Sequence, residues 1–352
     1  MSLFPKHIML NGARVLTDEF IQKQHKSEVE KELAGFLKEW YSPKDFLEVR
    51  TSGSTGIPKT IRLKKEFVAE SALRTLHFFQ LKTDDCVLHC LPLKFIAGKL
   101  MAVRALLGGL DLFLAEPTTD FSFLKNEKFR FAAMVPNQVG KILKAESTPG
   151  EFLGNIEKLL IGGSSVPNSL EETLQKVSIA CYSSYGMTET ATHIALRKIN
   201  GAGADGWYRC FEDINVNLSA GGCLQIFMPG LEKSLLRTTD IAELKDEKTF
   251  RILGRNDNVI ISGGIKFSPE QMEKKLETFI SEPFIFSSLP HRTLGQQLVL
   301  VIEGKETEEG RKHINETCRR ELTKYEQPKS IIYVSEIPKT ENGKLDRKAI
   351  KL

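Results

Sequence analysis

The stretch TSGSTGIPKT, from Thr51 to Thr60, has the composition of a loop that binds phosphate. Hydroxyl groups and glycine amides can donate hydrogen bonds to phosphate oxygens, and a lysine adds a compensating positive charge. We expect a cradle for the β- and γ-phosphates of a nucleotide; the alternative is an ordinary solvated Ser/Gly loop. The residues of the cradle would be Thr51, Ser52, Gly53, Ser54, Thr55, Gly56 and Lys59.

This stretch nearly matches the pattern G-x-x-x-x-G-K-[ST] of P-loop NTPases. Pro58 stands where the second glycine belongs, and proline has a fixed φ and no N–H to donate. A P-loop also opens a helix at its Lys-Ser/Thr pair, so that the positive helix end faces the phosphate. Here the residues TIRL alternate as in a strand, and a helical pattern begins only near Lys65. The sequence therefore argues against a P-loop NTPase.

Four further motifs follow this loop in order. They are GGSSVP at 162–167, YGMTET at 185–190, TTD at 238–240 with GRNDNVIISGGIKFSPE at 254–270, and PKTENGKLDR at 338–347. Together the five motifs resemble the core motifs of the adenylate-forming superfamily: acyl- and aryl-CoA ligases, luciferases and nonribosomal-peptide adenylation domains. The resemblance runs from about Thr51 to the C-terminus. It implies an enzyme that first joins a carboxylate to the α-phosphate of ATP, releasing pyrophosphate.

The resemblance assigns nucleotide-binding roles to several residues. Tyr185 would stack on adenine, since flat aromatic faces pair favourably with other π-systems. Thr188 and Glu189 would act in catalysis by meeting the α-phosphate and a Mg²⁺ ion, whose ligands are oxygens. Asp240 would accept hydrogen bonds from the ribose hydroxyls, and Arg255 would support the ribose or phosphate. The remaining positions implied to line the nucleotide site are Gly162, Gly163, Gly186 and Met187.

Lys344, in NGKLDR, is implied to be the catalytic lysine. Its ammonium would bridge the attacking carboxylate and the α-phosphate, stabilising charge that peaks in the transition state. A lone lysine near a C-terminus is ordinarily a solvated charge. The neighbouring Thr340, Gly343 and Arg347 match the family pattern, which favours the catalytic role.

A hinge is implied at Asp257, where a few residues would absorb a large change in φ and ψ. The expected domains are an N-terminal adenylation domain, 1–256, which binds ATP and acid, and a mobile C-terminal domain, 257–352. After rotation, Gly263 and Gly264 would let the pantetheine arm of CoA pass close to the backbone.

The segment CLPLKFIAGKLMAVRALLGG, at 90–109, matches the acyl-pocket motif of the superfamily, with Phe95 where many members carry histidine. Phe95, Gly98 and Lys99 are the candidates for binding the acid. Between positions 85 and 111 there is no acidic residue, whereas Lys94, Lys99 and Arg104 are basic. The positive charge of this segment limits which kind of acid the pocket can bind.

An amino-acid substrate would need a carboxylate for its ammonium group, because a buried cation without a partner is costly. A long-chain acyl group would not call for a cation. A second carboxylate on the substrate would, and Lys99, directly after Gly98, is placed to meet it. The alternative is that Lys99 is simply exposed.

The whole pattern, including SSYGMTETATHIAL, is most similar to the o-succinylbenzoate–CoA ligases of menaquinone biosynthesis. We therefore expect an acid–CoA ligase that uses ATP, Mg²⁺ and CoA. The alternatives are another aryl- or acyl-CoA ligase, a carboxylate adenylator with a different acceptor, and a non-catalytic nucleotide-binding protein. Since the phosphate loop begins at Thr51, we expect an abbreviated N-terminal region.

The elements expected around the motifs alternate between helices and strands. Helical spacing covers 27–40 and 67–79, and an apolar helix covers about 100–109. The runs CVLHCLPL and LDLFLAE read as strands, and FAAMV, IEKLLIGG and VSIACYSSYG read as buried strands that lead into polar or glycine-rich turns. This alternation predicts an α/β fold with largely parallel sheets packed with helices. Ligands in such sheets lie beyond the carboxyl ends of the strands.

From Asn256 on, the sequence predicts a small α+β domain. Ser268-Pro269-Glu270-Gln271 is typical of a capping box, followed by a buried face. QLVLVIE and SIIYVSE read as strands on either side of a charged helix from about 306 to 325. The residues of the expected buried face are Met272, Leu276, Phe279 and Ile280.

Composition limits the remaining possibilities. A net charge of +4 over 352 residues suits small anionic ligands better than nucleic acid. Six cysteines without a CxxC pair favour reduced thiols over disulfides or a zinc site. No apolar run is long enough for a signal peptide or a membrane span, so we expect a cytoplasmic protein that binds neither membrane nor nucleic acid.

Overall fold

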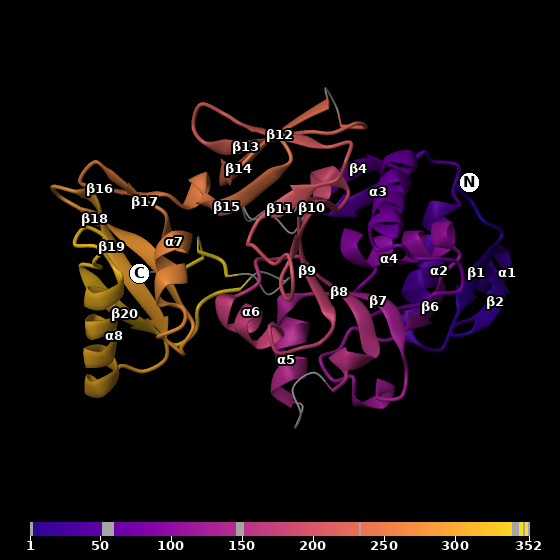
Figure 1. Ribbon diagram of the computed structural model, residues 1–352, viewed down its shortest axis with the longest axis horizontal. Helices are drawn as coiled ribbons and strands as arrows, with labels where there is room; N and C mark the ends of the chain where they lie inside the picture. The colour runs from indigo at the N-terminus through magenta and orange to yellow at the C-terminus, as the bar shows by residue number, and fades with distance from the viewer. Residues whose placement is uncertain are drawn as a thin grey trace. The chain divides into compact units, whose positions relative to one another are not determined.

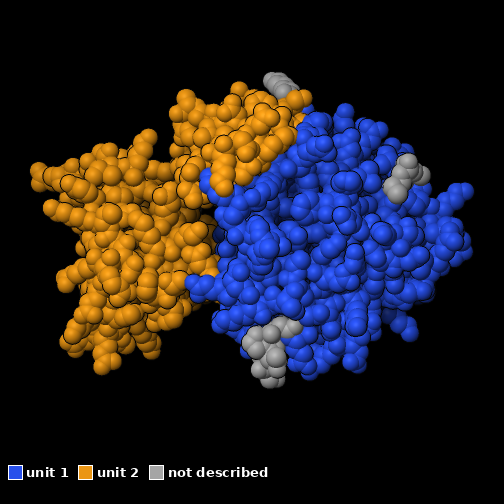
Figure 2. Space-filling view, viewed as in Figure 1, with its two compact units in different colours: residues 1–166, 170–214, 229–231 blue, residues 167–169, 215–228, 232–352 orange. Residues whose placement is uncertain are grey.

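The computed structural model describes residues 3–50, 60–145, 151–231, 234–339, 345–347 and 349–350 (Figure 1). The predicted phosphate cradle, 51–59, and the predicted catalytic Lys344 lie outside these ranges, so their roles stay predictions. The chain divides into two compact units (Figure 2). Unit 1 comprises 1–166, 170–214 and 229–231, and unit 2 comprises 167–169, 215–228 and 232–352.

A mixed sheet forms the centre of unit 1, with the strand order β11-β10-β9-β8-β7-β5-β6-β1-β2. The strands from β9 to β1 in this order run parallel, whereas β2, β10 and β11 each pair antiparallel with a neighbour. The predicted parallel sheet is thus confirmed. Their bounds are β1 (His7–Leu10), β2 (Ala13–Leu16), β5 (Cys86–His89), β6 (Asp111–Leu114), β7 (Phe129–Met134), β8 (Ile156–Ile161), β9 (Ala180–Gly186), β10 (His193–Lys198) and β11 (Tyr208–Cys210).

Helices cover both faces of this sheet (Figure 1). Apolar residues of α5 and α6 join one face in a single core cluster with β5, β7, β8 and β9. On the other face Phe79, at the end of α3, contacts Phe131 of β7 and Tyr182 of β9 at centroid distances of 4.9 and 5.2 Å. The bounds are α1 (Thr17–Gln22), α2 (Glu28–Trp40), α3 (Lys65–Phe78), α4 (Ile96–Gly108), α5 (Pro136–Ala145), α6 (Asn168–Leu174) and the 3-10 turns η1 (Ser122–Leu124), η2 (Leu153–Asn155) and η3 (Thr188–Thr190).

Local signals explain where two of the predicted helices begin. Ser27 caps α2 through a capping box with Glu30, which satisfies amides at the helix start. The strand predicted for TIRL is β4 (Thr60–Lys64), paired antiparallel with β3 (Phe46–Arg50), and α3 starts only at Lys65. Thr60 is thus the first residue of a strand rather than of a helix, which agrees with the sequence evidence against a P-loop.

Unit 2 contains two sheets. β12 (Asn215–Leu218), β13 (Cys223–Phe227), β14 (Leu235–Leu244) and β15 (Thr249–Arg255) form an antiparallel sheet in that order. After the turn η5 (Asn256–Asn258), a second sheet has the order β17-β16-β19-β18, with β20 parallel to β19. Its elements are β16 (Ile260–Ser262), β17 (Ile265–Phe267), β18 (Phe284–His291), β19 (Gly295–Glu303), β20 (Ser330–Val334), α7 (Pro269–Leu276) and α8 (Glu308–Glu321).

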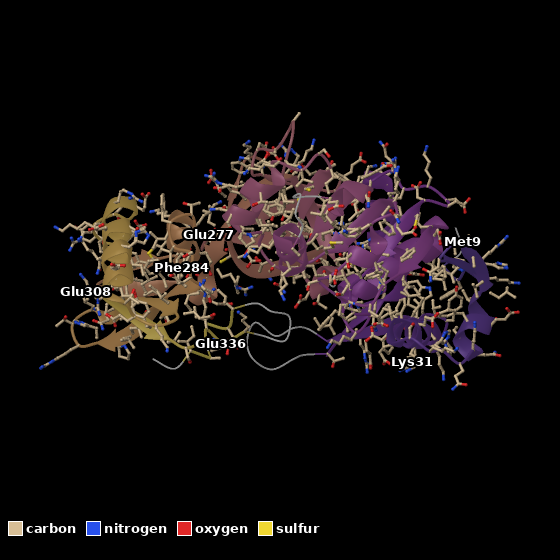
Figure 3. All side chains as sticks on the ribbon, turned by 90° about the horizontal axis from the view of Figure 1, so that it is seen from below. Met9, Lys31, Glu277, Phe284, Glu308 and Glu336 are labelled. Carbon is tan, nitrogen blue, oxygen red and sulfur yellow. The ribbon has the colours of Figure 1, made fainter. Side chains whose placement is uncertain are left out.

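The C-terminal core of unit 2 packs α7 and α8 against the second sheet (Figure 3). Met272, Leu276 and Ile280 are buried there, as predicted. The prediction for Phe279 is wrong: it lies beyond the end of α7, is 39% exposed, and has Arg320 stacked 4.7 Å from its ring centroid.

The predicted capping box at 268–271 is also wrong. Ser268 is the N-cap of α7, but its hydroxyl bonds no helix amide. It instead contacts the Glu270 carboxylate at 3.3 Å and the Leu253 carbonyl at 3.4 Å. The proline at the first helical position is present as expected, and it starts the helix with its fixed φ.

The division into these two compact units does not test the predicted rotation at 256/257. Residues 215–228 and 232–256 belong to the same compact unit as the residues that follow them. The position of the hinge stays a prediction. None of the described helices is both long and apolar enough to cross a membrane, and all six cysteines are free thiols.

Candidate active site

The motif YGMTET ends β9 and forms the tight turn into β10. Gly186 pairs with His193, and a Cβ on Gly186 would lie 2.2 Å from the Thr192 carbonyl oxygen, so no side chain fits there. The fully buried Thr190 closes the turn, because its Oγ1 accepts from the Met187 amide at 3.1 Å. This arrangement leaves Thr188 half-buried and Glu189 exposed.

The turn lies next to the strand that follows the predicted phosphate cradle. β4, which begins at Thr60, packs against η3. Glu189 is exposed, and it forms no ion pair with another residue that the structure describes. Among those residues no group of three or more His, Cys, Asp or Glu side chains could hold a metal ion. A single exposed carboxylate fits a Mg²⁺ ion that shares its other positions with phosphate and water oxygens.

Gly162 and Gly163 follow β8 beside the end of β9. A Cβ on Gly162 would lie 2.4 Å from Ser184 Oγ, and Gly163 has a φ of +87°. The half-buried Tyr185 has its ring 5.9 Å from that of Tyr208. Since β8 and β9 are parallel, these glycines and Tyr185 lie at the carboxyl ends of neighbouring strands. This is the edge where ligands bind in such sheets.

The predicted ribose and hinge residues form one cluster in unit 2. Asp240 and Arg255 are cross-strand partners in β14 and β15, with Oδ1 and Nη1 3.5 Å apart. Arg255 Nη2 also donates to Asp257 Oδ2 at 3.0 Å and to Thr239 Oγ1 at 2.6 Å. Asp240 is only 9% exposed. The strand register thus holds an acidic acceptor beside the residue predicted as the hinge.

Gly263 and Gly264 form the turn of the β16–β17 hairpin. Their φ values are +59° and +81°, a region that favours glycine. The Gly263 amide donates to the Leu294 carbonyl at 3.0 Å, which ties the turn to the segment before β19. Ile261 and Ile265 are exposed beside it. The CoA role predicted for the two glycines stays a prediction.

The acid-pocket segment forms the start of α4. Phe95 is the half-buried N-cap residue, and Lys94 lies 5.0 Å from its ring centroid. Gly98 lets α4 cross the preceding segment closely, since a Cβ there would lie 2.3 Å from the Pro92 carbonyl oxygen. Lys99 is not exposed: it is 7% accessible, and its Nζ donates to Glu39 Oε2 at 2.5 Å. Its ammonium already has an anionic partner.

Arg104, farther along α4, is a cation that sequence reasoning did not select. It is 2% exposed, and its only hydrogen bond to a described residue goes from Nη1 to Met101 Sδ at 3.3 Å. Its Nε has no partner, and no carboxylate of the described chain pairs with it. Burial lowers the pKa of Arg104 to about 9, because a low-dielectric site penalises the charged form.

His193, the first residue of β10, lies close enough to Arg104 to feel its charge. It is 4% exposed and hydrogen-bonded through Nε2 to Thr75 and through Nδ1 to Thr192, both at 3.2 Å. Burial, and then the positive charge of Arg104, hold the pKa of His193 well below its ordinary value of 6.5. The imidazole is therefore neutral and supplies no negative charge to Arg104.

The sequence carries little signal that would have separated Arg104 from Lys99. Every residue of α4 from Gly98 to Leu107 is buried, so the helix has no polar face from which to read orientation. The absence of acidic residues between 85 and 111 was the available clue, and it applied equally to both cations.

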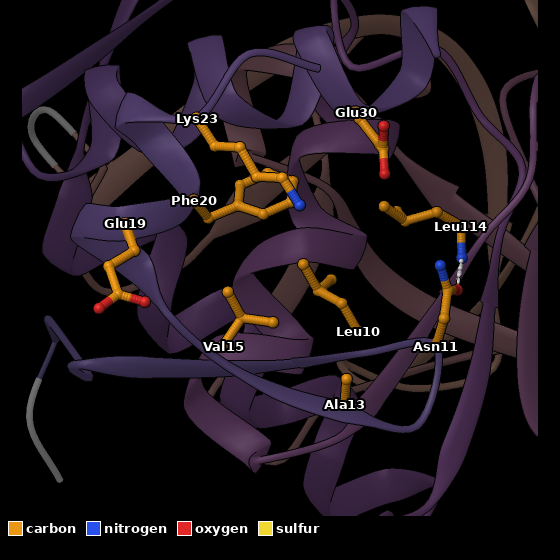
Figure 4. A pocket seen from close by; sticks show the side chains of 9 residues that line it. All are labelled: Leu10, Asn11, Ala13, Val15, Glu19, Phe20, Lys23, Glu30 and Leu114. Carbon is orange, nitrogen blue, oxygen red and sulfur yellow. Dashed lines mark hydrogen bonds between the residues drawn. The ribbon is translucent and has the colours of Figure 1, made fainter. Parts of the chain in front are cut away.

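A separate cavity of about 340 Å³ lies elsewhere in unit 1, between the β1–β2 hairpin and residues of α1 and α2 (Figure 4). Phe20, Lys23 and Glu30 are among its lining residues, and Asn11 Oδ1 accepts from the Leu114 amide at 2.9 Å at its edge. None of the described residues that are predicted to bind nucleotide or acid lines it.

Comparison with known proteins gives consistent matches. A 2-succinylbenzoate–CoA ligase of Bacillus mycoides (strain KBAB4) is 26% identical over 353 residues, covering 90% of this chain and 72% of the relative. An acyl-CoA synthetase (AMP-forming)/AMP-acid ligase II-like protein from Dyadobacter fermentans DSM 18053 has 32% identity and a TM-score of 0.63, with 95% of this chain and 96% of that chain covered.

One neighbour supports the fold alone. It is the o-succinylbenzoate coenzyme A synthetase (MenE) from Bacillus subtilis, in complex with ATP and magnesium ion. It shares 19% identity at a TM-score of 0.73, over 86% of this chain and 69% of that chain.

Two family models match separate parts of the chain. Residues 287–344 match the AMP-binding enzyme C-terminal domain. Residues 13–210, more than half of the chain, match the AMP-binding enzyme family itself. The protein belongs to the AMP-binding enzyme family.

Proposed function

We propose that this protein is an ATP-dependent acid–CoA ligase whose substrate is o-succinylbenzoate. In the first step a substrate carboxylate attacks the α-phosphate of ATP, forming the acyl-adenylate and releasing pyrophosphate. In the second step the CoA thiol attacks the acyl carbon, loses its proton and displaces AMP, leaving the thioester. Family membership and relatives named 2-succinylbenzoate–CoA ligase support this proposal.

The burial of Arg104 without an anion is the observation that carries the dicarboxylate assignment. Removing a charge from water costs several kcal/mol unless a partner compensates it, by the order of magnitude seen for buried ions. His193 beside Arg104 is neutral and cannot compensate. A substrate carboxylate that is not the activated one would supply the missing charge, and the planar guanidinium suits it bidentately.

Arg104 suits this role better than Lys99. Lys99 is committed to Glu39, and it also lies 3.5 Å from the Glu48 carbonyl oxygen. A substrate carboxylate at Lys99 would have to displace an existing ion pair, whereas at Arg104 it would form a new one. We therefore place the second carboxylate of the substrate at Arg104 and assign Lys99 to holding α2 against α4.

We propose nucleotide roles for the motif residues, and the turns that carry Tyr185, Thr188 and Glu189 are compatible with these roles. Tyr185 would stack on adenine, Thr188 would donate to an α-phosphate oxygen, and Asp240 would accept from the ribose hydroxyls. Glu189 would hold Mg²⁺, which when bound neutralises phosphate charge. Lys344 would contribute a positive charge where the carboxylate meets the α-phosphate. We further infer that the protein acts in the cytoplasm, where ATP and CoA are supplied.

Acid-dependent exchange of labelled pyrophosphate into ATP tests the proposal. The acids to compare are o-succinylbenzoate, benzoate and a fatty acid, each followed by CoA to measure the thioester. We expect exchange and thioester formation with o-succinylbenzoate far above the other two. Exchange with benzoate but not with the dicarboxylate would overturn the substrate assignment, and exchange with none of the acids would overturn the ligase.

Lys344→Ala separates the two half-reactions. We expect it to abolish exchange but largely spare thioester formation from supplied acyl-adenylate, since only the first step uses the lysine charge. Equal loss of both half-reactions would contradict the role given to Lys344.

A further inference from the structure

We infer that Arg347 and Glu273 form a positioning pair that fixes the segment carrying Lys344 onto α7. This inference rests on the proposed role of Lys344 in adenylation. It assigns to the two residues a function in placing that lysine, and neither of them contacts the reacting atoms in this account.

The pair is bidentate and largely buried. Arg347 Nη1 donates to Glu273 Oε1 at 2.6 Å, Nη2 donates to Oε2, and the two side chains are 19% and 16% exposed. Nη1 also donates to the Phe286 carbonyl at 3.1 Å, and the Phe286 amide donates to Glu273 Oε1 at 2.7 Å. Arg347 thereby joins the C-terminal segment to both α7 and β18.

The flanks of the Lys344 segment are held independently. Lys339 and Leu345 pair in an antiparallel bridge, and the Asp346 amide donates to the Pro338 carbonyl at 2.8 Å. Just before them, Ile337 is fully buried and its amide donates to Glu303 Oε2 at 2.9 Å. In the sequence Lys344 directly precedes Leu345 and is three residues before Arg347, so we expect a shift of Arg347 to affect it.

A further contact links the pair to the residue after the predicted hinge. Glu270, on the first turn of α7, accepts from Asn258 Nδ2 at 2.5 Å and lies 4.0 Å from Arg347 Nε. Asn258 directly follows Asp257. A continuous run of polar contacts therefore connects the hinge to the C-terminal segment, so that a rotation at Asp257 would carry both together.

Positioning explains this pair better than stability does. A buried ion pair is often no more stabilising than apolar residues of the same volume, because desolvation offsets the attraction. Its two parallel hydrogen bonds do fix orientation closely. Misplacing a reacting group by about 1 Å can cost about 100-fold in rate, so a fixed orientation matters most near a catalytic lysine.

The experiment measures both half-reactions in Arg347→Lys and Glu273→Gln. Each change keeps the size of the side chain but removes the bidentate geometry or the negative charge. We expect pyrophosphate exchange to fall about tenfold or more, and thioester formation from supplied acyl-adenylate to stay within about twofold. The matched control is Lys275→Met. Lys275 lies on α7, as Glu273 does, and the change breaks its 2.6 Å ion pair with Glu326. It should leave both rates unchanged.

Amide hydrogen exchange of residues 337–347 gives a second readout that needs no activity. We expect faster exchange in Arg347→Lys than in the wild type and no change in Lys275→Met. The inference is overturned if both half-reactions fall together, if the loss is no larger than in Lys275→Met, or if exchange at 337–347 is unchanged. If the wild type supports no pyrophosphate exchange with any acid, the proposed function fails instead, and the amide exchange still decides whether Arg347 holds the segment.

Discussion

Arg104 in unit 1 is buried and Arg347 in unit 2 is largely buried, and the two arginines differ in their partners. Arg347 has the carboxylate of Glu273 in a bidentate pair and Glu270 nearby. Arg104 has a methionine sulfur and a neutral histidine. The pairing raises the pKa of Arg347 against the opposing effect of burial, whereas burial alone lowers that of Arg104.

The difference separates two uses of a buried charge. A cation that carries its own anion can hold two elements in a fixed relation, as Arg347 joins the C-terminal segment to α7. A cation without one is destabilising in the free protein and becomes favourable only when a ligand brings the anion. We therefore propose the same residue type for positioning in unit 2 and for substrate recognition in unit 1.

Arg104→Met gives the largest effect expected from this comparison. Truncating one partner of a buried charge pair costs about 2–5 kcal/mol, so kcat/KM for o-succinylbenzoate should fall roughly 30- to 5,000-fold. The free energy of unfolding, measured in urea without substrate, should rise because an unpaired charge is removed. A variant that is less stable and still selects the dicarboxylate would break the comparison.

Arg347→Met should change stability in the opposite direction. It leaves Glu273 buried without its partner, so the free energy of unfolding should fall by about 3–5 kcal/mol. The double variant Arg347→Met/Glu273→Leu should recover most of this loss without restoring pyrophosphate exchange. Urea unfolding monitored by circular dichroism would measure all three proteins. Full recovery of exchange in the double variant would show that the pair serves stability alone.

Gly98→Ala sharpens the account of how α4 presents Arg104. The added methyl would lie 2.3 Å from the Pro92 carbonyl oxygen, so we expect the free energy of unfolding to fall by about 1–3 kcal/mol and the KM for the acid to rise. Gly35→Ala in α2 is the matched control, because its methyl meets no atom within 4 Å. It should be neutral or stabilising by up to about 1 kcal/mol. Equal effects of the two changes on unfolding would contradict the close crossing.

Acidification gives the smallest expected effect. Burial raises the pKa of Glu273 above its ordinary value of 4.5 although Arg347 acts in the opposite direction. Glu273 should therefore take up a proton at a higher pH than exposed glutamates, and the charge attraction to Arg347 is lost as the pH falls through that raised value. At that pH about half of the molecules lack the carboxylate, so exchange should fall about twofold. The rate of thioester formation from supplied acyl-adenylate should show no such fall over the same pH range. A pH profile of both half-reactions would test this.

The sequence predicted the central strands and most helices because their signals are local. Apolar runs that lead into polar or glycine-rich turns marked β7, β8 and β9, and helical spacing over 27–40 marked α2. Phe279 was misassigned because helical spacing continues past Leu276 while the helix itself ends there. The turn residues around Gly186 could be located from the motif alone, since only glycine fits beside the Thr192 carbonyl.

The two arginine environments could not be read from the sequence. Glu273 and Arg347 are 74 residues apart, and no periodic pattern joins them. Arg104 lies on a helix that is buried all round, so the pattern gives no direction for its side chain. Both environments depend on tertiary packing, which brings together groups from separate elements. The motif residues could be proposed from the sequence because their signal is local to each turn, and their roles stay predictions.

The central claim is that Arg104 binds the carboxylate that is not activated. Its most direct test compares kcat/KM for o-succinylbenzoate with that for an analogue in which this carboxylate is a methyl ester, in the wild type and in Arg104→Met. We predict that the wild type prefers the diacid by about 100-fold or more, and that the variant shows almost no preference. A wild type that uses both compounds equally, or a variant that keeps the full preference, would contradict the account.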